Sequence, residues 1–239
     1  MRLTISLWSR VAALLALPAI VFGGALVLPT AALAGCDDAP AAGVDWAGCR
    51  KRNVVLAGRD MTGSNMAGLD AIGSDLRDTK FPKVNFEKAM FNRVNASGAD
   101  MSGANLSKVE GARSTFIGTN LAGAVFDKAV LFRSSFQKSD LSGANLSKGE
   151  FSRSEFGEAT LSNADMSFSN VSRANFGGAT MDGVTLQGAW LYRTNLSGVD
   201  LSRAKGLTTE QVAIACGDTG TTLPEGITAP DTWPCGADE

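Results

Sequence analysis

Four cysteines are the most reactive side chains in this sequence of 239 residues, and they form two pairs near its ends. The first pair is Cys36 and Cys49, and the second is Cys216 and Cys235. The chain contains no histidine, which excludes serine–histidine–aspartate and cysteine–histidine catalytic systems and histidine-ligated metal sites. No C-x-x-C spacing is present, so zinc is not expected either. An even number of cysteines in an exported chain predicts disulfides, here Cys36–Cys49 and Cys216–Cys235.

Residues 1–34 have the features of a signal peptide. Arg2 and Arg10 are followed by an uncharged, mostly apolar run over residues 11–28, and Ala32-Leu33-Ala34 is typical of a cleavage site. We therefore expect cleavage after Ala34 and a periplasmic or secreted protein. Two alternatives remain open. The apolar run is just long enough to span a membrane uncleaved, and Leu33-Ala34-Gly35-Cys36 resembles a lipoprotein signal, in which Cys36 would carry lipid and leave one thiol unpaired.

Carboxylates that could act in pairs recur in one series, which includes Asp100, Asp140 and Asp200. Two such groups held together can act as general acid and general base. Asparagine and threonine take the same position at other places in the series, and the surface expected for this chain is convex and has no pocket. We therefore interpret these carboxylates as solvated surface residues. No glycine-rich phosphate loop is present, so neither an enzyme activity nor a cofactor is expected.

Basic residues recur at intervals of twenty in two series. The first series consists of Arg93, Arg113, Arg133, Arg153, Arg173 and Arg193, and the second of Lys88, Lys108, Lys128 and Lys148. Residues 50–205 contain 20 lysines and arginines against 15 aspartates and glutamates, a net charge of +5. Charge runs usually serve only as solvated faces, and Glu110 and Glu150 could neutralise part of this one. The sharper hypothesis is a basic stripe that binds an anionic partner.

The elements that must position these residues follow a repeat of five. Every fifth residue from Leu56 to Leu201 is Leu, Phe, Met or Val at 27 of 30 places. The residue two places earlier is Ala, Ser, Thr, Val or Gly at 28 of 30. Helices and strands have periods of 3.6 and 2, so neither explains this pattern. Residues two apart in an extended segment point to the same side. Both positions are therefore predicted to face inward, and the next two residues to turn a corner.

Units such as Ala99-Asp100-Met101-Ser102-Gly103 and Ala104-Asn105-Leu106-Ser107-Lys108 resemble the pentapeptide repeat proteins, over roughly residues 52–205. The resemblance implies an all-β fold: a right-handed, four-sided parallel β-helix with twenty residues in each coil. The sequence supports four sides independently, because a core series of Phe116, Phe136, Phe156 and Phe176 also recurs every twenty residues. A three-sided helix would scatter all three series. At about 4.8 Å per coil, the rod is expected to be roughly 35 Å long.

Both ends of such a rod expose sheet edges that must be covered. We predict an N-terminal cap over residues 35–52, with a disulfide and with Trp46 packed on the first coil, before a repeat helix over 53–205. A C-terminal cap over 206–239 follows. Within it, Thr208-Thr209-Glu210-Gln211 predicts a capping box that opens a short helix to about Cys216. The remaining tail, with Trp233 and Cys235, resembles a segment that often follows pentapeptide repeats and is expected to fold back over the last coil.

Three functions are compatible with these features. The first is a non-enzymatic exported scaffold that binds an anionic protein or envelope polymer through the basic stripe. The second is a structural envelope protein without a specific ligand. The third comes from the resemblance, because the quinolone-resistance members mimic DNA and engage gyrase with a strongly acidic rod. The positive charge of the repeats and the export signal both disfavour the third function. We therefore expect the first, with no nucleic acid as partner, and with membrane contact only if Cys36 is lipidated.

Overall fold

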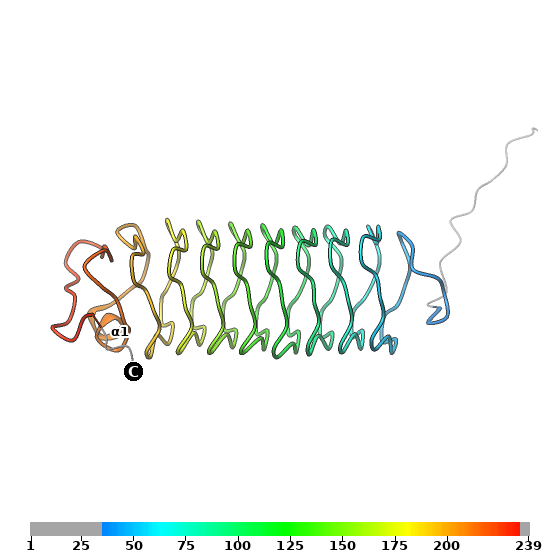
Figure 1. Cartoon of the computed structure of the whole chain (residues 1–239), viewed down its shortest axis with the longest axis horizontal. Helices are drawn as coiled ribbons and strands as arrows, with labels where there is room; N and C mark the ends of the chain where they lie inside the picture. Colours follow the sequence, from blue (N-terminus) through cyan, green and yellow to red (C-terminus); the bar gives the residue numbers. More distant parts are fainter. Residues whose placement is uncertain (1–34, 235–239) are drawn as a thin grey trace, which may run out of the picture. The chain divides into compact units, whose positions relative to one another are not determined.

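The computed structural model describes residues 35–234, which wind into a succession of stacked coils (Figure 1). Isolated parallel β-bridges join each coil to the next and connect residues twenty apart, from Asp45↔Asn65 to Thr185↔Lys205. Each coil is therefore twenty residues long and contains four units of five. Each side contributes a single bridged residue, so no longer strand forms in the described part of the chain. This parallel, four-sided arrangement is the one that the repeat predicts.

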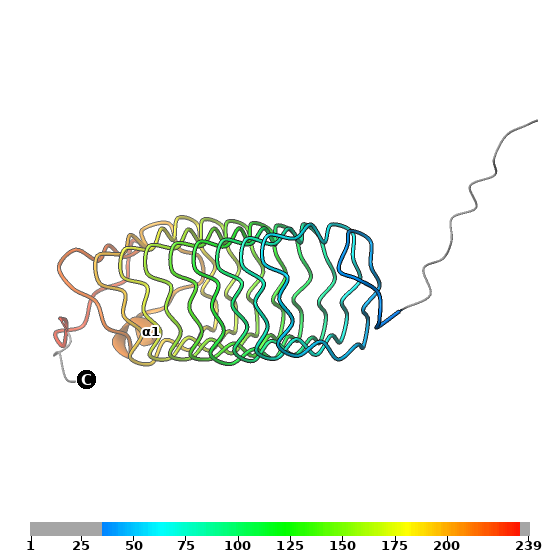
Figure 2. The ribbon, with the colours of Figure 1, turned by 45° about the vertical axis from the view of Figure 1, so that its right-hand side comes forward.

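Figure 2 shows the backbone of the coils from an oblique angle. The side chains at the two inward positions of the repeat fill the interior of these coils. Leu106 and Ala104, for example, have no exposed surface. The rings of Phe116, Phe136, Phe156 and Phe176 stack with centroids 5.0, 4.9 and 4.7 Å apart and with planes within 6° of parallel. The predicted aromatic series in the core is therefore confirmed. Arg59, one of the two residues that break the small inward series, is exposed.

Small residues at the large inward position compensate for larger neighbours in the adjacent coils. Gly111 lies between Phe91 and Leu131, which are twenty residues away on either side. A Cβ atom on Gly111 would lie 2.6 Å from Cδ2 of Leu131 and 3.1 Å from Cβ of Phe91. The departure of Gly111 from the sequence pattern is therefore required by packing in this column of the core.

The corners between sides have one conformation throughout the coils. The residue two places after each large inward residue has a positive φ at all 32 positions from Gly43 to Gly198. At most corners an amide then donates back across the turn, as when Ala104 N bonds Met101 O at 3.0 Å. This geometry is that of a type II turn. Seventeen of the 32 positions are not glycine, and twelve of those seventeen are lysine or arginine.

The coil geometry begins earlier than residue 53. The first bridge is made by Asp45, and Trp46 takes the large inward position with no exposed surface. Lys51 takes the next large inward position, where its ammonium nitrogen lies 4.3 Å from the centroid of the Trp46 ring. The sequence pattern does not reveal this first coil, because position 51 holds a lysine where the pattern expects an apolar residue. At this end of the coil stack, Lys51 covers the aromatic face of Trp46. A disulfide joins Cys36 to Cys49 within this segment, the pairing that the sequence predicts.

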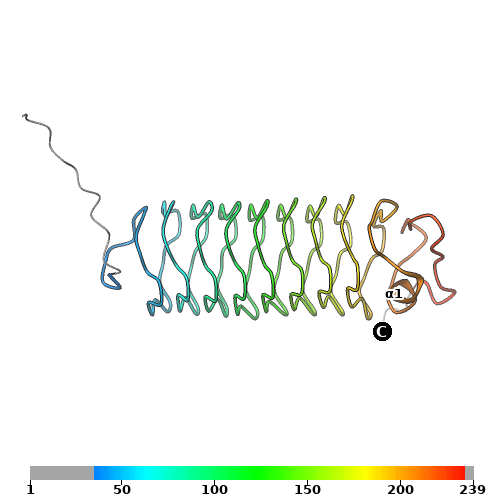
Figure 3. The ribbon, with the colours of Figure 1, turned by 180° about the vertical axis from the view of Figure 1, so that it is seen from behind.

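At the other end, the chain leaves the repeat through one short helix (Figure 3). Helix α1 (Thr209–Ala213) begins with the predicted capping box, in which Thr208 and Gln211 each bond the other's backbone amide. Nε2 of Gln211 also donates to the carbonyl oxygens of Leu186 and Ala189, at 2.8 and 2.7 Å. The helix ends at Ala213 rather than at Cys216, and Gln211 fastens it to the last coils.

The tail after α1 continues to pair with the last coil, although in a changed register. Bridges join Asn195 to Cys216 and Asp200 to Thr222, which are 21 and 22 residues apart instead of twenty. The indole nitrogen of Trp233 donates to the carbonyl oxygen of Ala215 at 2.8 Å, and the Trp233 ring packs against the core. The tail therefore lies over the last coil, as predicted, and covers its edge.

Candidate binding surface

Six arginines at equivalent corners form the candidate surface. This arginine column consists of Arg93, Arg113, Arg133, Arg153, Arg173 and Arg193, all with φ between 53° and 59°. The backbone amides of the first five members donate to the next coil, as when Arg153 N bonds Ser172 O at 2.8 Å, and that of Arg193 donates to Ile214 O after α1. Because the bridges keep a constant step of twenty here, the column runs straight along the coils at about 4.8 Å per step.

The corner backbone gives no reason for arginine at these places. A left-handed conformation costs a residue with a side chain about 1–2 kcal/mol relative to glycine. Other corners of the same chain use glycine, including Gly103 and Gly143, and Gly73 stands in the arginine column itself. Six successive arginines therefore need an explanation outside local folding: either a contribution to the surface or inheritance from repeat duplication.

Within the described residues, the six arginines have no carboxylate partner. None of them forms an ion pair within 4.0 Å among residues 35–234, and only Arg193 has an aromatic contact, 5.6 Å from the ring centroid of Tyr192. Glu110 and Glu150, which could have neutralised the column, do not do so. Glu150 instead accepts a hydrogen bond from the side-chain amide of Asn170 at 2.8 Å. The charge of the arginine column is therefore uncompensated.

The second basic series behaves differently. This lysine column consists of Lys88, Lys108, Lys128 and Lys148, on the neighbouring corner. Lys88 and Lys108 lie 3.7 and 3.0 Å from the carboxylate of Glu87, and Lys128 lies 3.8 Å from that of Asp127. The structure therefore divides the predicted stripe into a lysine column that Glu87 and Asp127 partly compensate and an arginine column without ion pairs among residues 35–234.

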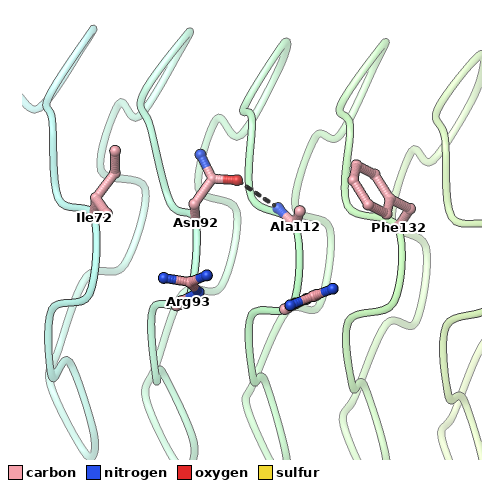
Figure 4. Close-up of a pocket in the computed structure, with 6 residues that line it drawn as sticks. Ile72, Asn92, Arg93, Ala112 and Phe132 are labelled. Atoms are coloured by element: carbon pink, nitrogen blue, oxygen red, sulfur yellow. Dashed lines mark hydrogen bonds between the residues drawn. The ribbon is translucent and has the colours of Figure 1, made fainter.

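Shallow hollows follow the arginine column. The first is lined by Ile72, Asn92, Arg93, Ala112, Arg113 and Phe132 (Figure 4). In Figure 4, Ile72, Asn92, Ala112 and Phe132 lie in a row on successive coils, with Arg93 beside this row. Asn92 Oδ1 accepts a hydrogen bond from Ala112 N at 3.1 Å. A second hollow is lined by Phe132, Arg133, Ser152, Arg153, Ser172 and Arg173. A third, lined in part by Tyr192 and Arg193, adjoins the C-terminal cap. These three hollows, which follow one another beside the column, are together called the trough.

Exposed aromatic residues border this trough, and sequence reasoning did not single them out. Phe132 and Tyr192 each directly precede an arginine of the column and are 39 and 40% exposed. Trp190 is 55% exposed, and its ring stacks on that of Tyr192 with centroids 6.4 Å apart and an interplanar angle of 22°. The available signal was their position, because Phe132 and Tyr192 are the aromatic members of a column that otherwise holds Ile72, Asn92, Ala112, Ser152 and Ser172.

The recurrent carboxylates stabilise corners. Asp100, Asp140 and Asp200 each accept the backbone amide of the residue two places on, at 3.1, 2.9 and 2.9 Å. Asp200 also accepts the hydroxyl of Thr222, and these bonds lower its pKa to about 2. The lowered pKa keeps Asp200 ionised and acting as an acceptor, which is unsuited to a general acid. Within residues 35–234, no group of three metal-ligating side chains is found.

The cysteines and the export segment are only partly described. No cysteine among residues 35–234 carries a free thiol. Cys235, the expected partner of Cys216, lies outside the described residues, as does the whole predicted signal peptide over 1–34. The described part of the chain contains no helix of the length and apolar character needed to cross a membrane.

Comparisons with known proteins agree with the geometry of the coils. A family model for pentapeptide repeats matches residues 52–87, 72–107 and 179–205, and a model described as a pentapeptide repeat region matches 112–186. A search of curated proteins found no significant match.

Similar solved structures include HetL, a pentapeptide repeat protein involved in regulating heterocyst differentiation in the cyanobacterium Nostoc sp. strain PCC 7120. It is 21% identical, with 79% of this chain and 90% of that chain covered and a TM-score of 0.46. A trypsin-treated form of QnrB1, a plasmid-mediated fluoroquinolone resistance protein, is also 21% identical over 77% of this chain and 84% of that one, with a TM-score of 0.36. Rfr23 from the cyanobacterium Cyanothece 51142 is 16% identical over 75% and 90%, with a TM-score of 0.29.

The matched segments lie within the coils and include every member of the arginine column. Lys108 of the lysine column falls in the unmatched gap at 108–111. The expected fold class, a right-handed quadrilateral parallel β-helix, is confirmed. With its five-residue units, four-sided coils and family-model matches, the chain belongs to the pentapeptide repeat family.

Proposed function

We propose that this protein is a non-enzymatic scaffold that acts outside the cytoplasm and binds an anionic protein or envelope polymer through its arginine column. The observation that carries the proposal is the absence of any carboxylate partner for six aligned arginines in the described chain. The export part of the proposal depends on the sequence of residues 1–34 alone.

The electrostatics of the arginine column favour a ligand-binding role over a role limited to solubility. Like charges one coil apart repel, and Glu87 and Asp127 partly compensate the neighbouring lysine column. No such compensation is present at the arginine column. An anionic partner would remove the repulsion and would gain from six guanidinium groups at once, each suited to carboxylate or phosphate oxygens.

The alternative is a structural envelope protein without a specific ligand. In that case the arginines only keep the rod soluble, and the repeats have copied them by duplication. A DNA-mimicking function is not proposed, since residues 50–205 carry a net charge of +5.

Salt-dependent co-sedimentation with envelope fractions tests the proposal. The variant Arg113→Ser/Arg133→Ser/Arg153→Ser removes three charges from the middle of the column. The matched control Lys83→Ser/Lys138→Ser/Lys148→Ser removes three charges from other corners of the same left-handed conformation. We expect binding by the wild type and the control to fall as salt rises, and binding by the arginine variant to be lost. If the folded arginine variant binds like the wild type, the column is surface decoration and the proposal is wrong.

A further inference from the structure

We infer that the arginine column and its neighbouring aromatic residues bind a linear acidic polysaccharide that carries a carboxylate on every sugar and lies along the coils. This inference rests on the proposed function and deepens it by naming the chemistry of the partner. Three features of the surface support it: its straightness, its unpaired guanidinium groups, and the placement of its aromatic rings.

Straightness favours an extended ligand. The six arginines span five steps of about 4.8 Å, roughly 24 Å in all. The bridges keep the same step of twenty along this whole span, so the column neither bends nor slips. A compact anion would contact one or two members and leave the others unpaired. A linked pyranose ring is about as long as one step. In a twofold acidic polysaccharide, whose carboxylates alternate between the two sides, the carboxylates on one side therefore recur at about every second arginine.

The charge and hydrogen-bonding capacity of the trough suit carboxylated sugars. Arg133, Arg153 and Arg173 are exposed and unpaired, and a guanidinium group can bind a carboxylate with two parallel hydrogen bonds. Ser152 and Ser172 line the same hollow and bring hydroxyl groups that can donate to or accept from sugar hydroxyls. Neither serine side chain has a hydrogen-bond partner within the described chain, because only their backbone groups take part in the bonds between coils.

The aromatic rings supply surfaces on which a sugar can stack. Tyr192 and Trp190 form a stacked pair at the C-terminal end of the column, and Arg193 lies over the Tyr192 ring. Phe132 stands in the middle of the column, three coils away. The negative face of an aromatic ring attracts the polarised C–H groups on one face of a pyranose. Exposed rings at two places along a charged trough therefore fit a polymer that has both apolar ring faces and regular negative charges.

Other linear anions fit less well. Carboxylates on one side of an extended acidic peptide recur at about 6.6 Å, out of step with the arginines. Phosphates of duplex DNA advance by about 3.4 Å along each strand and wind away from a straight column. Single-stranded nucleic acid favours a succession of aromatic platforms for its bases, whereas serine and arginine line the trough between Phe132 and Tyr192. An anionic lipid layer presents a flat surface and would not enter the hollows beside the column.

Direct binding of the purified protein to defined polymers tests the inference. The probe is a set of oligogalacturonates of increasing length. A neutral glucan, polyglutamate, single-stranded DNA and phosphatidylglycerol vesicles are measured beside it. We expect the oligogalacturonate affinity to rise with length until about five or six sugars span the column. The affinity should also fall roughly tenfold or more from low to physiological salt, and the neutral glucan should not bind measurably.

Two variants separate this inference from the proposed function. Arg153→Ser/Arg173→Ser should weaken binding of oligogalacturonate and polyglutamate together. Phe132→Ala should weaken only the oligogalacturonate, roughly threefold to tenfold, because only a sugar stacks on this ring, which lines both hollows. Phe168→Ala, which removes a 58% exposed ring from the neighbouring corner, should leave both affinities unchanged and serves as the control.

Each other outcome is decisive. Equal binding of polyglutamate and oligogalacturonate with no effect of Phe132→Ala would overturn the polysaccharide assignment and leave the anion-binding scaffold standing. Tighter binding of single-stranded DNA or of the vesicles would likewise overturn the assignment. If the folded Arg153→Ser/Arg173→Ser variant binds every polymer as the wild type does, both the inference and the proposed function are wrong.

Discussion

Removing the ring of Phe136 should destabilise the coils more than any surface change. The Phe136 side chain has no exposed surface and stacks on Phe116 and Phe156 at 5.0 and 4.9 Å. It also makes edge contacts with Phe126 and Phe151 at 6.1 and 6.0 Å. Phe136→Ala removes four ring contacts and leaves a cavity, and such substitutions cost about 3–5 kcal/mol. We expect a cost near the upper end of that range, for the reason given next.

The neighbouring coils cannot move together to close the cavity. Phe136 N donates to Glu155 O at 2.7 Å, and Phe116 N donates to Ser135 O at the same distance. Equivalent bonds on the other sides hold the coils one strand spacing apart, so the rings above and below lose their partner without finding another.

Denaturant unfolding followed by circular dichroism measures the cost, and hydrogen exchange of amides in the coils around Phe136 localises it. The control is Ser142→Ala, because the hydroxyl of this corner residue has no hydrogen-bond partner among the described residues. It should change the unfolding free energy by less than about 0.5 kcal/mol. Equal effects of the two substitutions would refute the assignment of inward and outward positions.

Two further predictions concern the ends of the rod. Replacing the Cys36–Cys49 disulfide by Cys36→Ser/Cys49→Ala should lower the unfolding free energy by about 2–4 kcal/mol, as for other loops of this size. Alkylation of the denatured, non-reduced protein should find no free thiol, and a diacylglyceryl group on Cys36 in the mass spectrum would contradict the disulfide. At the other end, Thr222 and Ser202 lower the pKa of Asp200 to about 2 from 3.8, so its contribution to stability is complete above pH 3.8 and is lost as the pH falls toward 2. Amide exchange at Thr222, which bonds Val199 O, should therefore accelerate over this acidic range in the wild type and much less in Asp200→Asn; identical pH profiles would refute the link.

The sequence was sufficient to predict the coils because their interior is specified residue by residue. A strict period of five separates inward from outward positions, and columns such as Phe116–Phe176 repeat every twenty residues only if a coil has four sides. The capping box of Thr208 and Gln211 was also predictable, since it depends on residues three apart.

Features that depend on the ends or on side-chain geometry were not predictable in the same way. The first coil was missed because Lys51 covers Trp46 at a position where the pattern demands an apolar residue. The register change after α1 was missed because Cys216 and Thr222 follow a segment without repeats. Ion pairing was missed for a different reason. Glu87 precedes Lys88 in sequence but lies closer to Lys108 of the next coil, so the neutralisation of a column depends on contacts across coils.

The separation between core and corner explains how a chain of this kind can carry a binding surface at low cost to its fold. The inward residues determine the stability of each coil, whereas the corner side chains point away from the core and contact mainly their equivalents in adjacent coils. A corner can therefore hold glycine, as at Gly103 and Gly123, or arginine, as at Arg113, with only a local backbone cost. Every corner from Gly43 to Gly198 has the same left-handed conformation. Six arginines in one column repeat that cost six times and add mutual repulsion. A fold that can place glycine at any corner has no structural need for this arrangement, so its explanation should be sought in what the column binds.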